Sequence, residues 1–176
     1  MSTPNYPPII VTGCQRSGTT IATHILADDL DRTPIDEFNF VMGQDYSNCV
    51  IQLPQAMDNY VLLQHVYPGV QFLFVNRDKK AIIASMKRIK WLKDDVHDWE
   101  QFLERYVNSR FDAWSLMASQ IPDCTGFINY DELSKHPFFV ARKRRAGFTS
   151  KQWQVGQPIG PRHWTNNIKC IQSMYE

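Results

Sequence analysis

The sequence predicts an α/β fold of the P-loop type: three layers, α/β/α, with helices on both faces of a central parallel sheet. Two observations carry this prediction. Apolar, β-branched runs alternate with segments of helical periodicity, and the first such run ends in a glycine loop of the form GxxxxG. With 176 residues, 43% of them hydrophobic, the chain is long enough for one sizeable core and too short for two typical domains. We therefore expect a single compact domain spanning residues 1–176.

The elements follow from periodicity and from turn residues. Apolar runs predict buried strands over 8–12, 49–53, 71–76 and 126–130. Apolar residues at helical spacing predict helices over 19–30, 55–66, 78–90 and 95–119. From Arg142 onward no regular pattern is recognisable. In a parallel sheet of this kind, ligands bind at the carboxyl ends of the strands, where the glycine loop stands.

Composition narrows the function classes. Nineteen basic and eighteen acidic residues leave a net charge of +1, so the overall charge gives no support to a nucleic-acid partner. The four cysteines stand far apart, without the paired spacing of a zinc site or the density of a disulfide scaffold. No apolar run reaches the roughly 20 residues of a membrane span, and no export signal opens the chain. We expect a soluble, cytoplasmic protein that binds neither nucleic acid nor membrane.

The glycine loop, GCQRSGTT at 13–20, lies between a predicted strand and a predicted helix. In that setting backbone N–H groups can converge on an anion at the helix N-terminus. A nucleotide-hydrolysing P-loop would continue with lysine and then a serine or threonine that holds magnesium. Here Thr19 and Thr20 fill those places, and the cation is Arg16, inside the loop. The simpler interpretation is a tight turn with a solvated arginine.

Arg16-Ser17-Gly18-Thr19-Thr20 resembles the loop with which the sulfotransferase family binds the 5′-phosphosulfate of 3′-phosphoadenosine 5′-phosphosulfate. That family holds the 3′-phosphate of the same donor with an arginine just after a core strand and a serine eight residues later. Arg77 and Ser85 stand in that relation after the strand at 71–76. The resemblance therefore implies that this loop, Arg77 and Ser85 bind the donor, and that no metal is required.

A third segment, Phe127 to Leu133, is similar to a late strand of these enzymes in which a tyrosine borders the adenine pocket. Tyr130 takes that place, and an ordinary core tyrosine is the alternative. The basic run Arg142-Lys143-Arg144-Arg145 is only loosely similar to a 3′-phosphate segment of the family, and a surface run is the simpler interpretation.

The residue that accepts the acceptor's proton differs between branches of the family. In the branch with a histidine or lysine before a proline, the matching place here holds Gln52. The branch that includes the tyrosylprotein sulfotransferases uses a glutamate about twenty residues after the loop arginine. Glu37 stands 21 residues after Arg16, and we select it as the base, with its neighbour Asp36 as the rival. A solvated acidic pair is the non-catalytic alternative.

The resemblance thus implies a sulfotransferase that moves a sulfuryl group to an acceptor hydroxyl by in-line displacement. Glu37 would remove the acceptor's proton, and Arg16 would stabilise charge on the departing phosphate. Sugar, peptide tyrosine and small alcohol all fit as acceptors, and the sequence leaves the oligomeric state open. Two alternatives stay open: a P-loop kinase or hydrolase, and a nucleotide-binding module without catalysis.

Overall fold

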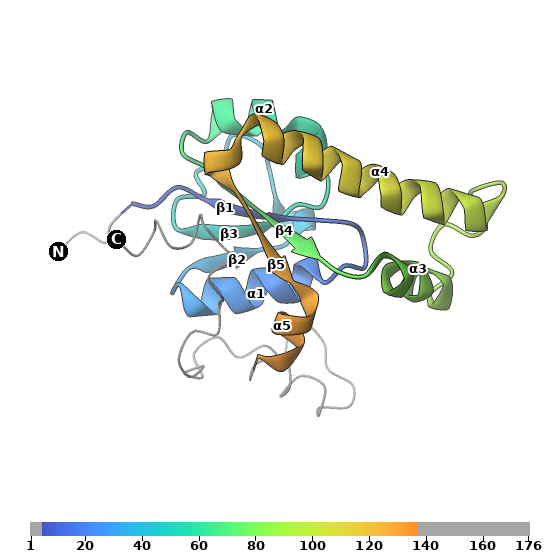
Figure 1. Ribbon diagram of the computed structural model, residues 1–176. Coiled ribbons are helices and arrows are strands. Elements are labelled where there is room, and N and C mark those ends of the chain that lie inside the picture. Colours follow the sequence, from blue (N-terminus) through green and yellow to red (C-terminus); the bar gives the residue numbers. More distant parts are fainter. Residues whose placement is uncertain (1–4, 137–176) are drawn as a thin grey trace.

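Five strands form one parallel sheet in the order β2-β3-β1-β4-β5 (Figure 1). The computed structural model describes residues 5–136. The strands are β1 (Ile9–Thr12), β2 (Thr33–Ile35), β3 (Cys49–Gln52), β4 (Gln71–Asn76) and β5 (Thr125–Asn129). The predicted α/β fold with a central parallel sheet is confirmed.

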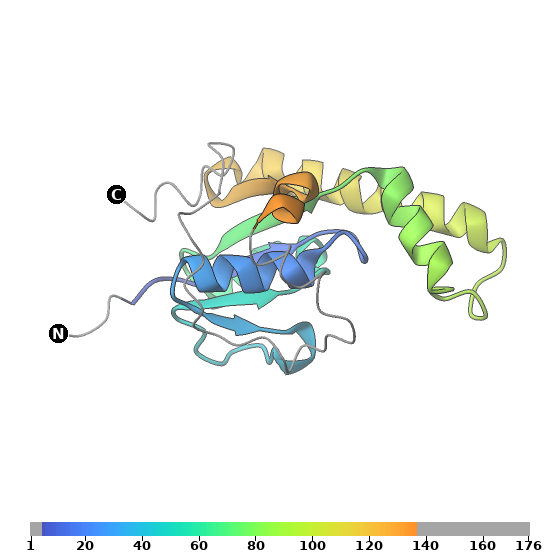
Figure 2. The same cartoon turned by 90° about the horizontal axis from the view of Figure 1, so that it is seen from below.

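Helices cover both faces of this sheet. One face carries α1 (Thr19–Asp29) and α5 (Tyr130–Lys135), and the other carries α2 (Ala56–Val66) and α4 (Trp99–Gln120) (Figures 1 and 2). Helix α3 (Lys79–Arg88) and the first half of α4 extend beyond the carboxyl edge of the sheet (Figure 1). Two short 3-10 turns, Glu37–Asn39 and Pro122–Cys124, complete the elements.

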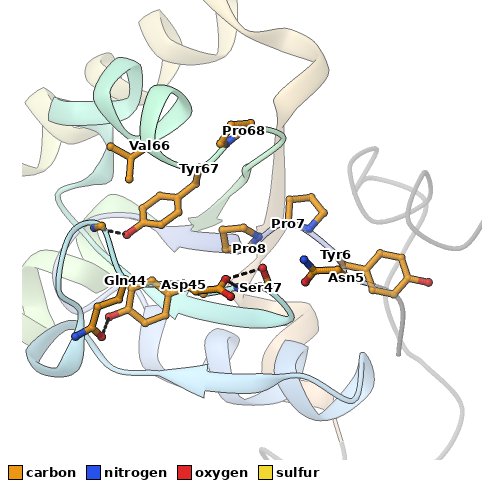
Figure 3. Close-up of a pocket in the computed structure, with 12 residues that line it drawn as sticks. Asn5, Tyr6, Pro7, Pro8, Gln44, Asp45, Ser47, Val66, Tyr67 and Pro68 are labelled. Atoms are coloured by element: carbon orange, nitrogen blue, oxygen red, sulfur yellow. Dashed lines mark hydrogen bonds between the residues drawn. The ribbon is translucent and has the colours of Figure 1, made fainter. Parts of the chain in front are cut away.

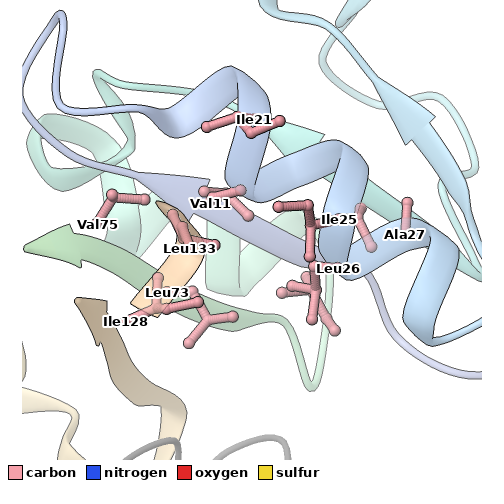
Figure 4. Close-up of a cluster of buried hydrophobic side chains, with 12 residues drawn as sticks. Val11, Ile21, Ile25, Leu26, Ala27, Leu73, Val75, Ile128 and Leu133 are labelled. Carbon is pink, nitrogen blue, oxygen red and sulfur yellow. The ribbon is translucent and has the colours of Figure 1, made fainter. Parts of the chain in front are cut away.

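The core lies on both faces of β1 because successive side chains of a strand point to opposite sides. Ile9 and Val11 pack against α1 in one buried cluster, which Leu133 of α5 joins (Figure 4). Ile10 points the other way, into a cluster that includes Phe72 and aromatic residues of α4. Burial on both sides explains why the strands appear in the sequence as continuous apolar runs.

Three differences from the expected elements have local causes. Strand β2 was not predicted, since it is short and holds Pro34, which a sheet tolerates only at an edge such as this one. The helix expected from residue 95 begins at Trp99, because Asp98 has a φ of 51°. Tyr130 was expected to end a strand and instead begins α5.

Residues 5–136 test some of the remaining predictions and leave others outside their range. Within 5–136, no helix combines the length and the apolar character that crossing a bilayer requires. The basic run at 142–145 lies outside these residues, and the single domain over 1–176 stays a prediction.

Candidate anion-binding site

The glycine loop leaves β1 and turns directly into α1. The N–H of Ser17 donates to the carbonyl of Cys14 at 3.0 Å, and Arg16 has a φ of 69°. Gly18 caps α1, which has no side-chain cap and no acidic residue in its first turn. The first amides of a helix have no partner within the helix, and the macrodipole makes that end positive. The loop and the start of α1 therefore favour an anion.

Both glycines of the loop are required by close approaches. A Cβ at Gly13 would lie 2.8 Å from the Oγ of Ser17. Gly18 has a φ of 106°, and a Cβ there would lie 2.7 Å from the ring of Tyr130. Both distances are shorter than a Cβ normally approaches, so a larger residue at Gly13 would displace the Ser17 hydroxyl and one at Gly18 would displace the Tyr130 ring.

The hydroxyl of Ser17 is a second feature of the loop that favours an anion. Ser17 is fully buried, and within residues 5–136 its Oγ has no hydrogen-bond partner. Leaving a buried hydroxyl unsatisfied costs about 1–3 kcal/mol. Phosphate or sulfate oxygens held by the loop amides would fit this hydroxyl. Thr19 is buried beside it, whereas Arg16 and Thr20 are exposed.

Arg77 and Tyr130 meet at the loop because of the register of two neighbouring strands. Asn76 of β4 is the register partner of Asn129 of β5, and their side chains are hydrogen-bonded at 2.9 Å. The next residue on each strand therefore leaves the sheet at the same level. Arg77 donates from Nη1 to the carbonyl of Arg16 at 2.8 Å, and its guanidinium carbon lies 4.0 Å from the centre of the Tyr130 ring.

Ser85 lies on the second turn of α3, as its spacing predicted, and is buried. Its hydroxyl accepts a long hydrogen bond of 3.5 Å from Arg88, and no hydrogen bond within residues 5–136 joins it to Arg77. Of the nearby lysines, Lys79 donates to Asn108 on α4 at 2.7 Å, and Lys87 pairs with Glu100 at 2.9 Å. These two lysines attach α3 to α4.

The two candidate bases follow β2, at the same edge of the sheet as the loop. Asp36 lies 3.6 Å from Nε2 of His24 on α1, a pairing that the sequence did not reveal. Glu37 is half-buried at the start of the 3-10 turn, and its carboxylate has no hydrogen bond or ion pair with other described residues. Gln52, in the place of the family's lysine or histidine, is the last residue of β3 and is buried.

Residues behind the loop hold it against α4, and sequence reasoning missed them. Cys14 is buried in the cluster between α3 and α4, and this burial raises the pKa of its thiol to about 12. Burial also raises the pKa of Tyr106 to about 12, while a backbone hydrogen bond at Gln15 lowers it. Arg110, one turn further along α4, donates to both carboxylate oxygens of Asp58 on α2. The shared helical face of Tyr106 and Arg110 was the available signal.

A separate cavity of about 410 Å³ opens at the other edge of the sheet, before β1, β3 and β4 begin (Figure 3). Tyr6, Pro8, Tyr46, Tyr67 and Pro68 contribute to its wall. The hydroxyls of two of these tyrosines are engaged by the 39–44 segment: Tyr67 accepts from the N–H of Gly43, and Tyr46 accepts from that of Val41. The cavity is therefore distinct from the loop site.

The parallel sheet, the loop after β1 and the helix that it opens place the protein in the P-loop α/β/α class. Among solved structures, the sulfotransferase domain from the curacin biosynthetic pathway aligns with a TM-score of 0.58 and 14% identity, over 96% of this chain and 83% of that chain. Shikimate kinase from Bacteroides thetaiotaomicron aligns with a TM-score of 0.49 and 17% identity, over 77% of this chain and 92% of that one. No protein-family model and no curated protein matches the chain. The first likeness establishes a sulfotransferase-like fold.

Proposed function

We propose that this protein is a sulfotransferase that uses 3′-phosphoadenosine 5′-phosphosulfate to sulfate an acceptor hydroxyl. The observation that carries the proposal is the contact between Arg77 and the carbonyl of Arg16 at 2.8 Å. Two motifs that are 61 residues apart in the sequence, each similar to a different phosphate site of sulfotransferases, lie against each other.

The residues present fit such a donor. The loop offers amides at the N-terminus of α1 and the orphan hydroxyl of Ser17 for the 5′-phosphosulfate. Arg77 donates one N–H to Arg16, and a guanidinium has five, so others are available for a 3′-phosphate. Ser85 is the second candidate for that phosphate, since the one described hydrogen bond of its hydroxyl, from Arg88, is long. When bound, the donor supplies an activated sulfuryl group.

For transfer, the chain itself would supply a base for the acceptor hydroxyl and a positively charged loop for the departing phosphate. Glu37 is the proposed base, because its carboxylate is uncommitted among described residues while Asp36 pairs with His24. Arg16, exposed in the loop, and the hydroxyls of Thr19 and Thr20 would stabilise the charge that develops on the departing phosphate. Gln52 is neutral and takes no proton.

Thermal unfolding with nucleotides tests the proposal. Adenosine 3′,5′-bisphosphate should raise the melting temperature, because ligand at 100 times its dissociation constant adds about 2.7 kcal/mol to stability. ATP with magnesium should raise it much less, since it lacks the 3′-phosphate and the loop lacks the P-loop lysine. Equal stabilisation by both would favour a P-loop kinase or hydrolase.

Catalysis needs a separate assay with labelled donor and acceptors from each class: sugars, tyrosine peptides and small alcohols. Transfer of label to one class identifies the acceptor. Tight binding of the bisphosphate without transfer to any acceptor would instead indicate a binding module that has lost catalysis.

A further inference from the structure

Tyr130 lies between the two halves of the proposed donor site. Its ring lies under the guanidinium of Arg77, at 4.0 Å from ring centre to guanidinium carbon. The ring also abuts Gly18, where an added Cβ would lie 2.7 Å from it. The ring is therefore close to both the loop glycine and the arginine of the second motif.

The position of the ring is fixed from below. Tyr130 is the first residue of α5 and packs against the cluster beneath α1, in which Leu133 is buried. The strand before it is held in register with β4 through the pair Asn76 and Asn129. Because the helix and the strand on either side of Tyr130 are both fixed, its ring offers a rigid face. A planar guanidinium stacks well on such a face.

Arg77 in turn supports a strained part of the loop. Arg16 has a φ of 69°, a conformation that non-glycine residues adopt only at a cost of about 1–3 kcal/mol. Its carbonyl receives the hydrogen bond from Arg77 at 2.8 Å. The Tyr130 ring thus contacts the Arg77 guanidinium, which in turn is hydrogen-bonded to the strained loop residue Arg16.

We infer that Tyr130 is a positioning residue for Arg77, rather than the wall of an adenine pocket, which the family resemblance implies, or an ordinary core tyrosine. The ring holds the guanidinium where one of its N–H groups reaches the Arg16 carbonyl. Because Arg77 is thereby attached to the loop, its ability to bind a 3′-phosphate depends on the conformation of the loop. The inference rests on the proposed function for the identity of the ligand, but not for the contact between Tyr130 and Arg77.

Nucleotide titrations separate the two roles. Calorimetry would compare adenosine 3′,5′-bisphosphate with adenosine 5′-phosphate, which lacks the 3′-phosphate. Tyr130→Leu should weaken binding of the bisphosphate by about 2- to 30-fold, the range expected for a partly exposed cation–π contact, and change binding of the monophosphate by less than about twofold. Tyr130→Phe keeps the ring and should recover most of the loss. Phe127→Leu, an exposed ring on β5, controls for a generic loss of aromatic surface.

The double variant Arg77→Ala/Tyr130→Leu tests the dependence directly. If the ring acts through Arg77, Tyr130→Leu should weaken the bisphosphate no further once Arg77 is gone. Equal losses for both nucleotides, or additive losses in the double variant, would restore the adenine-wall interpretation. Should Tyr130→Leu fail to fold, Arg77→Lys keeps the charge but removes the planar face, and it should weaken the bisphosphate selectively.

A measurement without nucleotide distinguishes failure of this inference from failure of the proposed function. Nuclear magnetic resonance of arginine side chains should place the Arg77 N–H signals upfield, because they lie over the ring, and Tyr130→Leu should move them to ordinary positions. If the wild-type protein binds neither nucleotide, the proposed function fails. If the Arg77 signals keep the same chemical shift in Tyr130→Leu as in the wild type, the positioning role is overturned.

Discussion

Arg110 on α4 forms a bidentate ion pair with Asp58 on α2, donating hydrogen bonds of 2.7 and 2.9 Å to the two carboxylate oxygens. The Arg110 side chain is 17% exposed and that of Asp58 is 45% exposed, so water reaches only one partner freely. This pair holds together the two helices that cover one face of the sheet.

Removing the Arg110–Asp58 pair should cost measurable stability. A double-mutant cycle of Arg110→Ala and Asp58→Ala, followed by urea unfolding, should give a coupling of about 0.5–1 kcal/mol that shrinks in high salt. Lys87 and Glu100, 39% and 73% exposed, form the matched control and should show weaker coupling. Equal coupling in the two pairs would mean that the bidentate geometry adds nothing.

Gly18→Ala should damage both the fold and the anion site. The substitution adds strain at a φ of 106° and a clash with the Tyr130 ring, together on the order of 2–4 kcal/mol. Gly43→Ala is the control, since Gly43 has a φ of 88° but nothing within 4 Å of its added Cβ, so only strain of about 1 kcal/mol applies. Denaturant midpoints and bisphosphate affinity measure the two effects. Similar costs at both positions would contradict the close packing of Tyr130.

Stability should fall in alkaline solution through Cys14 and Tyr106. Their pKa values are raised by burial to about 12, from ordinary values of 9.0 and 10.0. The unfolded chain then loses these protons first, so the stability is present below pH 9 and is lost as the pH rises toward 12, by up to about 1.4 kcal/mol per pH unit for each group. Free energies of unfolding between pH 8 and 11 should therefore fall less steeply in Cys14→Ala and in Tyr106→Phe than in the wild type. Parallel curves would show that these groups do not contribute.

The proposed base can be tested with an active acceptor in hand. Glu37→Gln keeps the size of the side chain but cannot accept a proton, so turnover should fall by about 10²–10⁴ while bisphosphate affinity stays close to normal. Asp36→Asn should be milder, because Asp36 is paired with His24. If turnover is lost in Asp36→Asn and normal in Glu37→Gln, Asp36 is the base. Normal turnover in both variants would contradict a carboxylate mechanism.

Local patterns predicted the elements that are buried on both faces. The strand at 71–76 was predicted with its observed bounds, and the loop with its helix was predicted to within a residue, because apolar runs and glycines are properties of short segments. Strand β2 escaped notice because an edge strand of this length, with Pro34 inside it, carries little periodic signal. The contacts of Arg77 with Arg16 and with Tyr130 depend on strand order and register, which no local pattern encodes.

The same register governs when the site can first exist during synthesis. Arg16, Arg77 and Tyr130 come from the beginning, middle and end of residues 5–136, and β5 is the last strand of the sheet to be made. A nascent chain that stops short of Thr125 carries the whole glycine loop, yet Arg77 has no ring to stack on and β4 presents an open edge. Assembly of the site therefore waits for β5, the last strand among the described residues, and chains truncated before it expose the edge of β4 that β5 covers.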